Sequence, residues 1–111
     1  MKERIAIING LRSPIAKANG KLNDLSADTL GAIITKELVL RNELDYKQFD
    51  EVIMGNVAQP SKAMNIARVM AIRAGFPQST PAYTVHRNCA SGMQSISSAI
   101  EKINSNQGDL Y

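Results

Sequence analysis

The apolar positions of this chain fall into short continuous runs that are separated by longer segments with helical spacing. Three runs predict strands, because each is short and is bounded by turn-forming residues. They cover Ile5–Ile8, Glu51–Gly55 and Tyr83–Val85. The first run is apolar at every position and ends at Asn9-Gly10, which is typical of a strand buried on both faces.

The segments between these runs predict three helices. Ser26 or Asp28 can cap the first helix. The second, over Met64–Ala74, is apolar on almost every side, so we expect it to be buried between other layers. The third begins near Cys89. The apolar residues that recur at steps of three and four in the first and third helices are Leu30, Ile33, Ile34 and Leu38, then Met93, Ile96, Ile100 and Ile103.

The order of these elements predicts an α/β protein with the pattern β-α-β-α-β-α and a parallel sheet with right-handed crossovers. The whole chain of 111 residues is expected to form one domain. After the turn at 106–109, Leu110-Tyr111 resembles the start of another strand. We therefore expect residues 1–111 to be a fragment of a longer chain that stops before its fourth strand; the family resemblance described below implies that the fragment is an N-terminal domain.

Composition narrows the class of protein. Hydrophobic residues make up 44% and charged residues 21%, which is typical of a globular protein rather than a disordered one. The net charge of +3 comes from scattered Lys and Arg, and two Phe and three Tyr provide few stacking surfaces. Nucleic-acid binding is therefore not expected.

The chain shows no apolar stretch of about 20 residues that could span a membrane and no targeting segment at its start. A single cysteine excludes an internal disulfide, which fits a reducing compartment. We expect a cytoplasmic protein. One cysteine and one histidine are also too few ligands for a metal site.

Cys89 lies where the third strand leads into the third helix. Free backbone N–H groups and the helix dipole at such a position stabilise a thiolate, and they can stabilise the oxyanion of a thioester during acyl transfer. A lone cysteine is also often only a small buried apolar residue. Both interpretations remain open from the residues alone. For His86 and Arg87 a structural or interface role is favoured over a general base or a phosphate ligand.

The segment Asn88–Gln94 resembles the active-site cysteine motif of thiolases, the acyl-CoA C-acyltransferases. Three further segments resemble that family in the same order along the chain. They are Arg12-Ser13-Pro14 with Lys17 and Gly20, then Glu51–Val57, and Asn65–Arg68. The resemblance implies the thiolase fold, in which two similar α/β halves form five α-β-α-β-α layers around the active site.

The resemblance also implies a reaction. Cys89 is the expected nucleophile that accepts an acyl group from a coenzyme A thioester, and its own backbone N–H is an expected oxyanion donor. Coenzyme A thioesters would be substrates in fatty-acid β-oxidation or acetoacetyl-CoA metabolism, with no permanently bound cofactor. The strand Tyr83–Arg87 is expected to pair with its twin in a homodimer or homotetramer.

Two other kinds of protein are alternatives to a thiolase. The first is a related β-ketoacyl synthase-type condensing enzyme, which Arg12-Ser13-Pro14 and Asn65–Arg68 disfavour. The second is a truncated, non-catalytic oligomerisation module. Because the family's Gly-His-Pro histidine and second cysteine belong to its C-terminal half, residues 1–111 alone are expected to be inactive and to associate through an exposed sheet edge.

Overall fold

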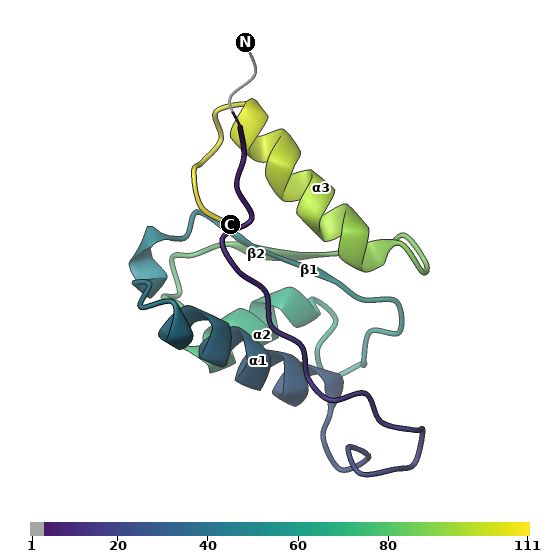
Figure 1. The fold of residues 1–111 in the computed structure, drawn as a ribbon. Coiled ribbons are helices and arrows are strands. Elements are labelled where there is room, and N and C mark those ends of the chain that lie inside the picture. The colour runs from purple at the N-terminus through teal and green to yellow at the C-terminus, as the bar shows by residue number, and fades with distance from the viewer. Residues whose placement is uncertain (1–3) are drawn as a thin grey trace.

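A two-stranded parallel sheet lies between a pair of helices on one face and a single helix on the other, within the part of the chain that the structure describes (Figure 1). The structure is a computed structural model and describes residues 4–111. Its elements, in chain order, are α1 (Ala27–Arg41), a 3-10 helix (Tyr46–Gln48), β1 (Val52–Gly55), α2 (Ile66–Ala74), β2 (Ala82–Val85) and α3 (Ser91–Asn104).

The two strands are parallel because α2 carries the chain back across one face of the sheet between them. Val52 pairs with Ala82, and Gly55 pairs with Val85 at the carboxyl end. The ladder extends one residue further, where the N–H of Asn56 donates to the carbonyl of Val85 at 3.1 Å. The predicted β-α-β unit from 51 to 85 is therefore confirmed, and both strands end at the same edge.

The main core lies between α1, α2 and β1. Its buried members are Val39, Val52, Ala71, Ala74 and Phe76. The alanines of α2 are completely or almost completely buried, which lets that helix lie close to the sheet. On its other side, however, Ile72 is 41% exposed. The prediction that α2 is buried all round was therefore wrong for its outer face, because no described layer covers it.

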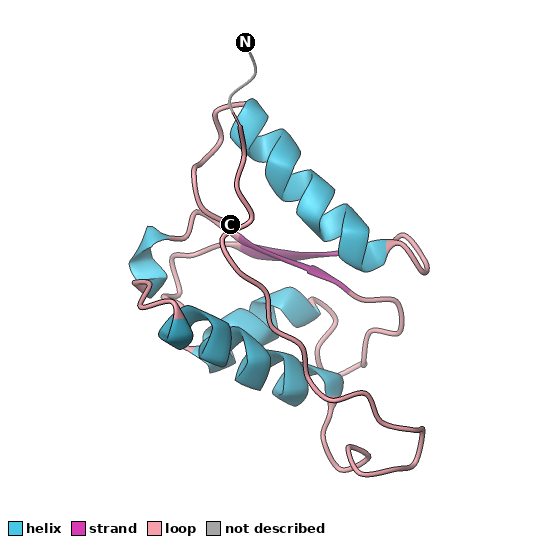
Figure 2. Ribbon diagram, viewed as in Figure 1, coloured by secondary structure: helices cyan, strands magenta, loops and turns pink. Residues whose placement is uncertain are grey.

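The segment Ile5–Ile8 does not form the predicted first strand, and Figure 2 shows it as loop. None of its backbone groups makes a hydrogen bond within residues 4–111, and Ile7 and Ile8 are 75% and 61% exposed. It instead runs along an apolar groove of about 450 Å³, whose other walls come from α1, β1 and α3. An apolar run favours burial, but it becomes a strand only when a neighbour supplies the hydrogen-bond ladder.

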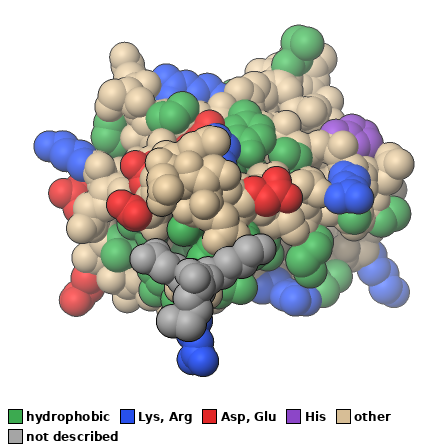
Figure 3. Space-filling model, turned by 90° about the horizontal axis from the view of Figure 1, so that it is seen from above, with side chains coloured by type: hydrophobic (Ala, Val, Ile, Leu, Met, Phe, Trp, Pro, Cys, Tyr) green, Lys and Arg blue, Asp and Glu red, His purple; other side chains and the backbone are tan. Residues whose placement is uncertain are grey.

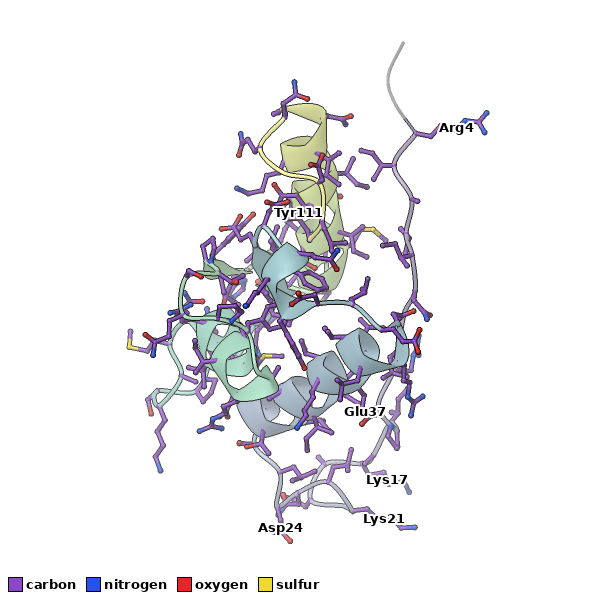
Figure 4. All side chains as sticks on the ribbon, turned by 90° about the vertical axis from the view of Figure 1, so that its left-hand side faces the viewer. Arg4, Lys17, Lys21, Asp24, Glu37 and Tyr111 are labelled. Carbon is purple, nitrogen blue, oxygen red and sulfur yellow. The ribbon has the colours of Figure 1, made fainter. Side chains whose placement is uncertain are left out.

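Residues 11–25 form a loop that extends away from the helices (Figure 1) and contains turns near Gly20. Lys17 and Lys21 project into solvent from it (Figure 4). Ser26 then precedes α1 in extended conformation, and its hydroxyl bonds to that of Thr29 at 2.8 Å instead of capping the backbone. No helix among residues 4–111 is long and apolar enough to cross a membrane.

Candidate functional site

A tight turn joins the carboxyl end of β2 to α3 and contains Cys89. Within it, the N–H of Ala90 donates to the carbonyl of Arg87 at 3.0 Å, and the N–H of Ser91 donates to that of Asn88 at 3.1 Å. Asn88 has a φ of 48°, in the left-handed region that asparagine tolerates better than most residues. The helix begins at Ser91, so Cys89 lies in the turn rather than in the helix itself.

The side chain of Cys89 is exposed to solvent, which excludes the interpretation of a buried apolar cysteine in this structure. The N-terminal end of α3, which carries the partial positive charge of the helix dipole, lies next to Cys89 in the chain. Within residues 4–111, the N–H groups of Cys89, Gly92 and Met93 have no hydrogen-bond acceptor. An accessible sulfur next to unpaired amides can hold negative charge on sulfur or on a nearby oxyanion.

Ser91 ties this turn to the rest of the molecule. Its side chain is 4% exposed and its hydroxyl makes two bonds, accepting from the N–H of Arg87 at 2.8 Å and donating to the carbonyl of Asn88 at 2.7 Å. The last residue of β1, Gly55, lies against the backbone of Ser91 and Gly92. The start of α3 is therefore held directly against the sheet.

The polar neighbours of Cys89 make hydrogen bonds within the turn and the start of α3. The ring Nδ1 of His86 accepts a hydrogen bond from the N–H of Asn88 at 3.2 Å, and Arg87 donates to the side chain of Gln94 one turn into α3. The only histidine of the chain lies on the surface (Figure 3). Both residues thus brace the turn, in keeping with the structural role favoured from the sequence.

A second network fixes β2 to α2 and explains the Asn65–Arg68 segment. Asn65 donates to the carbonyl of Ala82 at 3.0 Å, and its side-chain oxygen accepts from Thr84 at 2.9 Å. Thr84 also accepts from the N–H of Ala67 at 3.0 Å. Arg68 donates to two carbonyls in the loop before β2, at 2.8 and 2.9 Å. Sequence reasoning did not single out Thr84, although a polar residue on a short strand was a signal for such a bond.

The far end of α3 is anchored to the start of β1. Lys102 forms an ion pair with Glu51 at 2.9 Å, which raises the pKa of the lysine. The carboxylate of Asp50 accepts from the N–H groups of Asp109 and Leu110, which lowers the pKa of Asp50. The Lys102–Glu51 pair therefore holds the C-terminal end of α3 beside the start of β1, and Asp50 holds the segment that follows α3.

The motifs that the sequence singled out do not all converge on Cys89. The Glu51–Val57 segment meets the first turn of α3 through Gly55. The loop with Arg12-Ser13-Pro14 leads instead into α1, on the opposite face of the sheet from α3 (Figure 1). Lys17 points away from the body of the molecule (Figure 4). Among the described residues, the turn that contains Cys89 is therefore supported by β1 and α3, while the Arg12-Ser13-Pro14 loop lies elsewhere.

Comparison with known proteins identifies the family of this chain. The chain belongs to the thiolase family, because residues 5–111 match the family model for the thiolase N-terminal domain. The resemblance and the thiolase-like α/β fold predicted from the sequence are both confirmed.

Individual relatives support the same class. Over 108 residues the chain is 40% identical to a 3-ketoacyl-CoA thiolase of Shewanella pealeana, covering 97% of this chain and 25% of the relative. A probable acetyl-CoA acyltransferase of Staphylococcus aureus is 35% identical over 107 residues, 96% of this chain and 27% of the relative. The chain thus spans about a quarter of the length of these relatives.

Two solved structures have the same fold. One is the Acat5 thiolase of Ascaris suum in complex with coenzyme A, with a TM-score of 0.79 and 34% identity over 84% of this chain and 24% of the other. The second is the Bacillus anthracis acetyl-CoA acetyltransferase, with a TM-score of 0.82 and 36% identity over 86% of this chain and 24% of the other.

Proposed function

We propose that the protein to which residues 1–111 belong transfers acyl groups between coenzyme A thioesters through Cys89. The observation that carries the proposal is the exposed sulfur of Cys89, in the turn that leads into α3, in a chain of the thiolase family. A relative named 3-ketoacyl-CoA thiolase and a neighbour in complex with coenzyme A support this substrate class.

The reaction would proceed in two steps. In thiolysis, the Cys89 thiolate attacks the 3-keto carbonyl of a 3-ketoacyl-CoA, the C2–C3 bond breaks and acetyl-CoA leaves as its enolate, which takes up a proton; free coenzyme A, attacking as its thiolate, then takes the acyl group and restores the Cys89 thiolate. In condensation, the Cys89 thiolate attacks the thioester carbonyl of acetyl-CoA and coenzyme A leaves as its thiolate; the enolate of a second acetyl-CoA then takes the acetyl group and restores the Cys89 thiolate. The N–H of Cys89, which has no acceptor within residues 4–111, would donate to the oxyanion in both steps.

Residues 1–111 would contribute the nucleophile and its supports as the N-terminal domain of a larger catalytic unit. The general base would come from outside this chain, because its one histidine already accepts the N–H of Asn88 through Nδ1. We therefore expect residues 1–111 alone to show no turnover.

Assembly would use the free edge of β2. Within residues 4–111 this strand pairs only with β1, so one row of its backbone groups lacks a strand partner. Such an edge can pair with an identical strand of a second copy. We propose a homodimer or homotetramer through Tyr83–Arg87, acting in the cytoplasm on β-oxidation or acetoacetyl-CoA intermediates.

Trapping of the acyl-enzyme tests the proposal. The protein at its natural length is mixed with acetyl-CoA, quenched in acid and digested, and its peptides are weighed by mass spectrometry. One acetyl group is expected on Cys89, and none is expected in Cys89→Ser under the same conditions. An acetyl group on another residue in Cys89→Ser, or an unmodified Cys89 in the wild type, would refute the assignment. Release of acetyl-CoA from 3-ketoacyl-CoA substrates of different length then defines the substrate.

A further inference from the structure

We infer that Ser91 is the positioning residue that holds the sulfur of Cys89 in place for acyl transfer. Ser91 is one of the few buried polar residues among residues 4–111, at 4% exposure. It does not lie in the exposed turn with Cys89, so the hydroxyl would act on the reaction through the turn and not by touching the substrate. The inference rests on the proposed role of Cys89.

The hydroxyl of Ser91 closes a ring around Cys89. It accepts from the N–H of Arg87 at 2.8 Å, before the cysteine, and donates to the carbonyl of Asn88 at 2.7 Å. Both peptide groups precede Cys89, and Ser91 follows it. The backbone on either side of the cysteine is therefore joined by one side chain, which limits how far the turn can open.

This bracing opposes a conformational cost in the turn. Asn88 adopts a φ of 48°, in the left-handed region, where a non-glycine residue is less stable than in an ordinary backbone conformation. The two hydrogen bonds of one buried hydroxyl can offset that difference. Without these two hydrogen bonds, the turn is expected to relax toward an ordinary backbone conformation, and Cys89 would move with it.

Ser91 is itself held in place by the sheet, through its contact with Gly55 of β1. Its carbonyl carbon and oxygen lie so close to Gly55 that a Cβ there would be 2.4 Å from them. The first residue of α3 therefore cannot shift toward β1. The hydroxyl thus links the Cys89 turn to a residue that packs directly on the sheet, as positioning requires.

The test compares three variants in the protein at its natural length. Ser91→Ala removes both bonds, while Ser91→Thr keeps the hydroxyl. Ser95→Ala is the matched control, because the Ser95 hydroxyl makes a bond of the same length to the carbonyl of Gly92 in the same helix but lies outside the turn. Each variant is assayed for acylation by acetyl-CoA, for alkylation by iodoacetamide, for kcat and KM, and for its urea unfolding midpoint.

A positioning role predicts that Ser91→Ala slows acylation of the Cys89 sulfur much more than it slows alkylation of the same sulfur. Acylation needs the thiolate aligned with a bound thioester, so Ser91→Ala should acylate about 10- to 100-fold more slowly, with the loss in kcat rather than KM. Alkylation by a small reagent that reaches the sulfur from solvent needs no such alignment and should change less than about threefold. Ser91→Thr should recover most of the acylation rate, and Ser95→Ala should behave as wild type.

Several results would overturn the inference. Acylation of Ser91→Ala at the wild-type rate, a parallel loss of acylation and alkylation, or a folded Ser91→Thr without recovery would each do so. If Ser91→Ala does not fold, the comparison moves to an Asn88→Gly background, where glycine relieves the left-handed strain but restricts the turn less than asparagine does, so that the Ser91 hydroxyl is still needed to hold the turn in one conformation. Equal acylation by Asn88→Gly with and without Ser91→Ala would then refute the role. A wild-type protein that is not acylated at Cys89 would instead refute the proposed function, and this inference with it.

Discussion

Gly55 ends β1 against the first turn of α3, where there is no room for a side chain. A Cβ at this position would lie 2.4 Å from the carbonyl carbon and oxygen of Ser91 and 2.6 Å from the nitrogen of Gly92. All three are backbone atoms, so no side-chain rotation can make room. In Gly55→Ala, either β1 or the start of α3 must move. Movement of the start of α3 would shift the Cys89 turn, which leads directly into that helix.

The cost can be worked out from two opposing effects. Overpacking of a tight interior contact costs about 1–3 kcal/mol. Alanine also restricts the unfolded chain more than glycine does, which stabilises the folded protein by about 0.4–1 kcal/mol where the native backbone conformation suits alanine. Gly55 does not have a positive φ, so this stabilisation applies. We expect Gly55→Ala to lower the free energy of unfolding by about 1–2 kcal/mol.

Urea unfolding followed by circular dichroism measures this difference in residues 1–111. The midpoint should fall while the slope with denaturant stays constant, because the same surface is exposed on unfolding. Gly92→Ala is the matched control at the same helix end, since a Cβ there meets no atom within 4 Å. It should be neutral or stabilising, by up to about 1 kcal/mol from helix propensity. Equal stability of Gly55→Ala and wild type would refute the close contact between β1 and α3.

Three further predictions concern the framework around the site. Tyr46→Phe should leave stability unchanged or raise it by about 1 kcal/mol in urea unfolding, because the buried Tyr46 hydroxyl has no partner within residues 4–111; a loss above that size would reveal a missed bond. Asn65→Ala should cost about 1–2 kcal/mol, since it removes the bonds to Ala82 and Thr84; a cost near zero would show that the bonds between α2 and β2 are dispensable. The lowered pKa of Asp50 means that its contribution to stability is present above the unfolded-state pKa of about 3.9 and is lost as the pH falls through the lower folded-state pKa. Asp50→Asn should therefore flatten unfolding free energy against pH in this acid range, and an unchanged slope would contradict the assignment.

Most elements of this fold could be predicted from local patterns. The apolar spacing of Leu30–Leu38 and Met93–Ile103 predicted two helices that the structure confirms. Gly75 ends α2 in the left-handed conformation that glycine commonly adopts after a helix. The strands at 52–55 and 82–85 were likewise found within one residue or so. These features depend on propensity and periodicity within a few residues, which a single sequence displays directly.

The predicted first strand failed because pairing is not a local property. Ile5–Ile8 has the apolar character of a buried strand, yet a ladder requires a neighbouring backbone in register along its length. Within residues 4–111 the segment lies along the groove beside β1 and makes no such bonds. Hydrophobicity indicated where the segment would lie but not what it would bond to.

Motifs and periodicity were enough to predict the family, the parallel βαβ unit and the place of Cys89 between a strand and a helix, because these are local features of the chain. The three-dimensional structure was needed to show that the sulfur is exposed, that Ser91 bonds to the backbone groups before Cys89, and that Gly55 supports the helix start. These features depend on contacts between residues far apart in sequence, or on the direction of one hydroxyl. The geometry of the site therefore follows from packing, while its chemistry follows from the order of its residues.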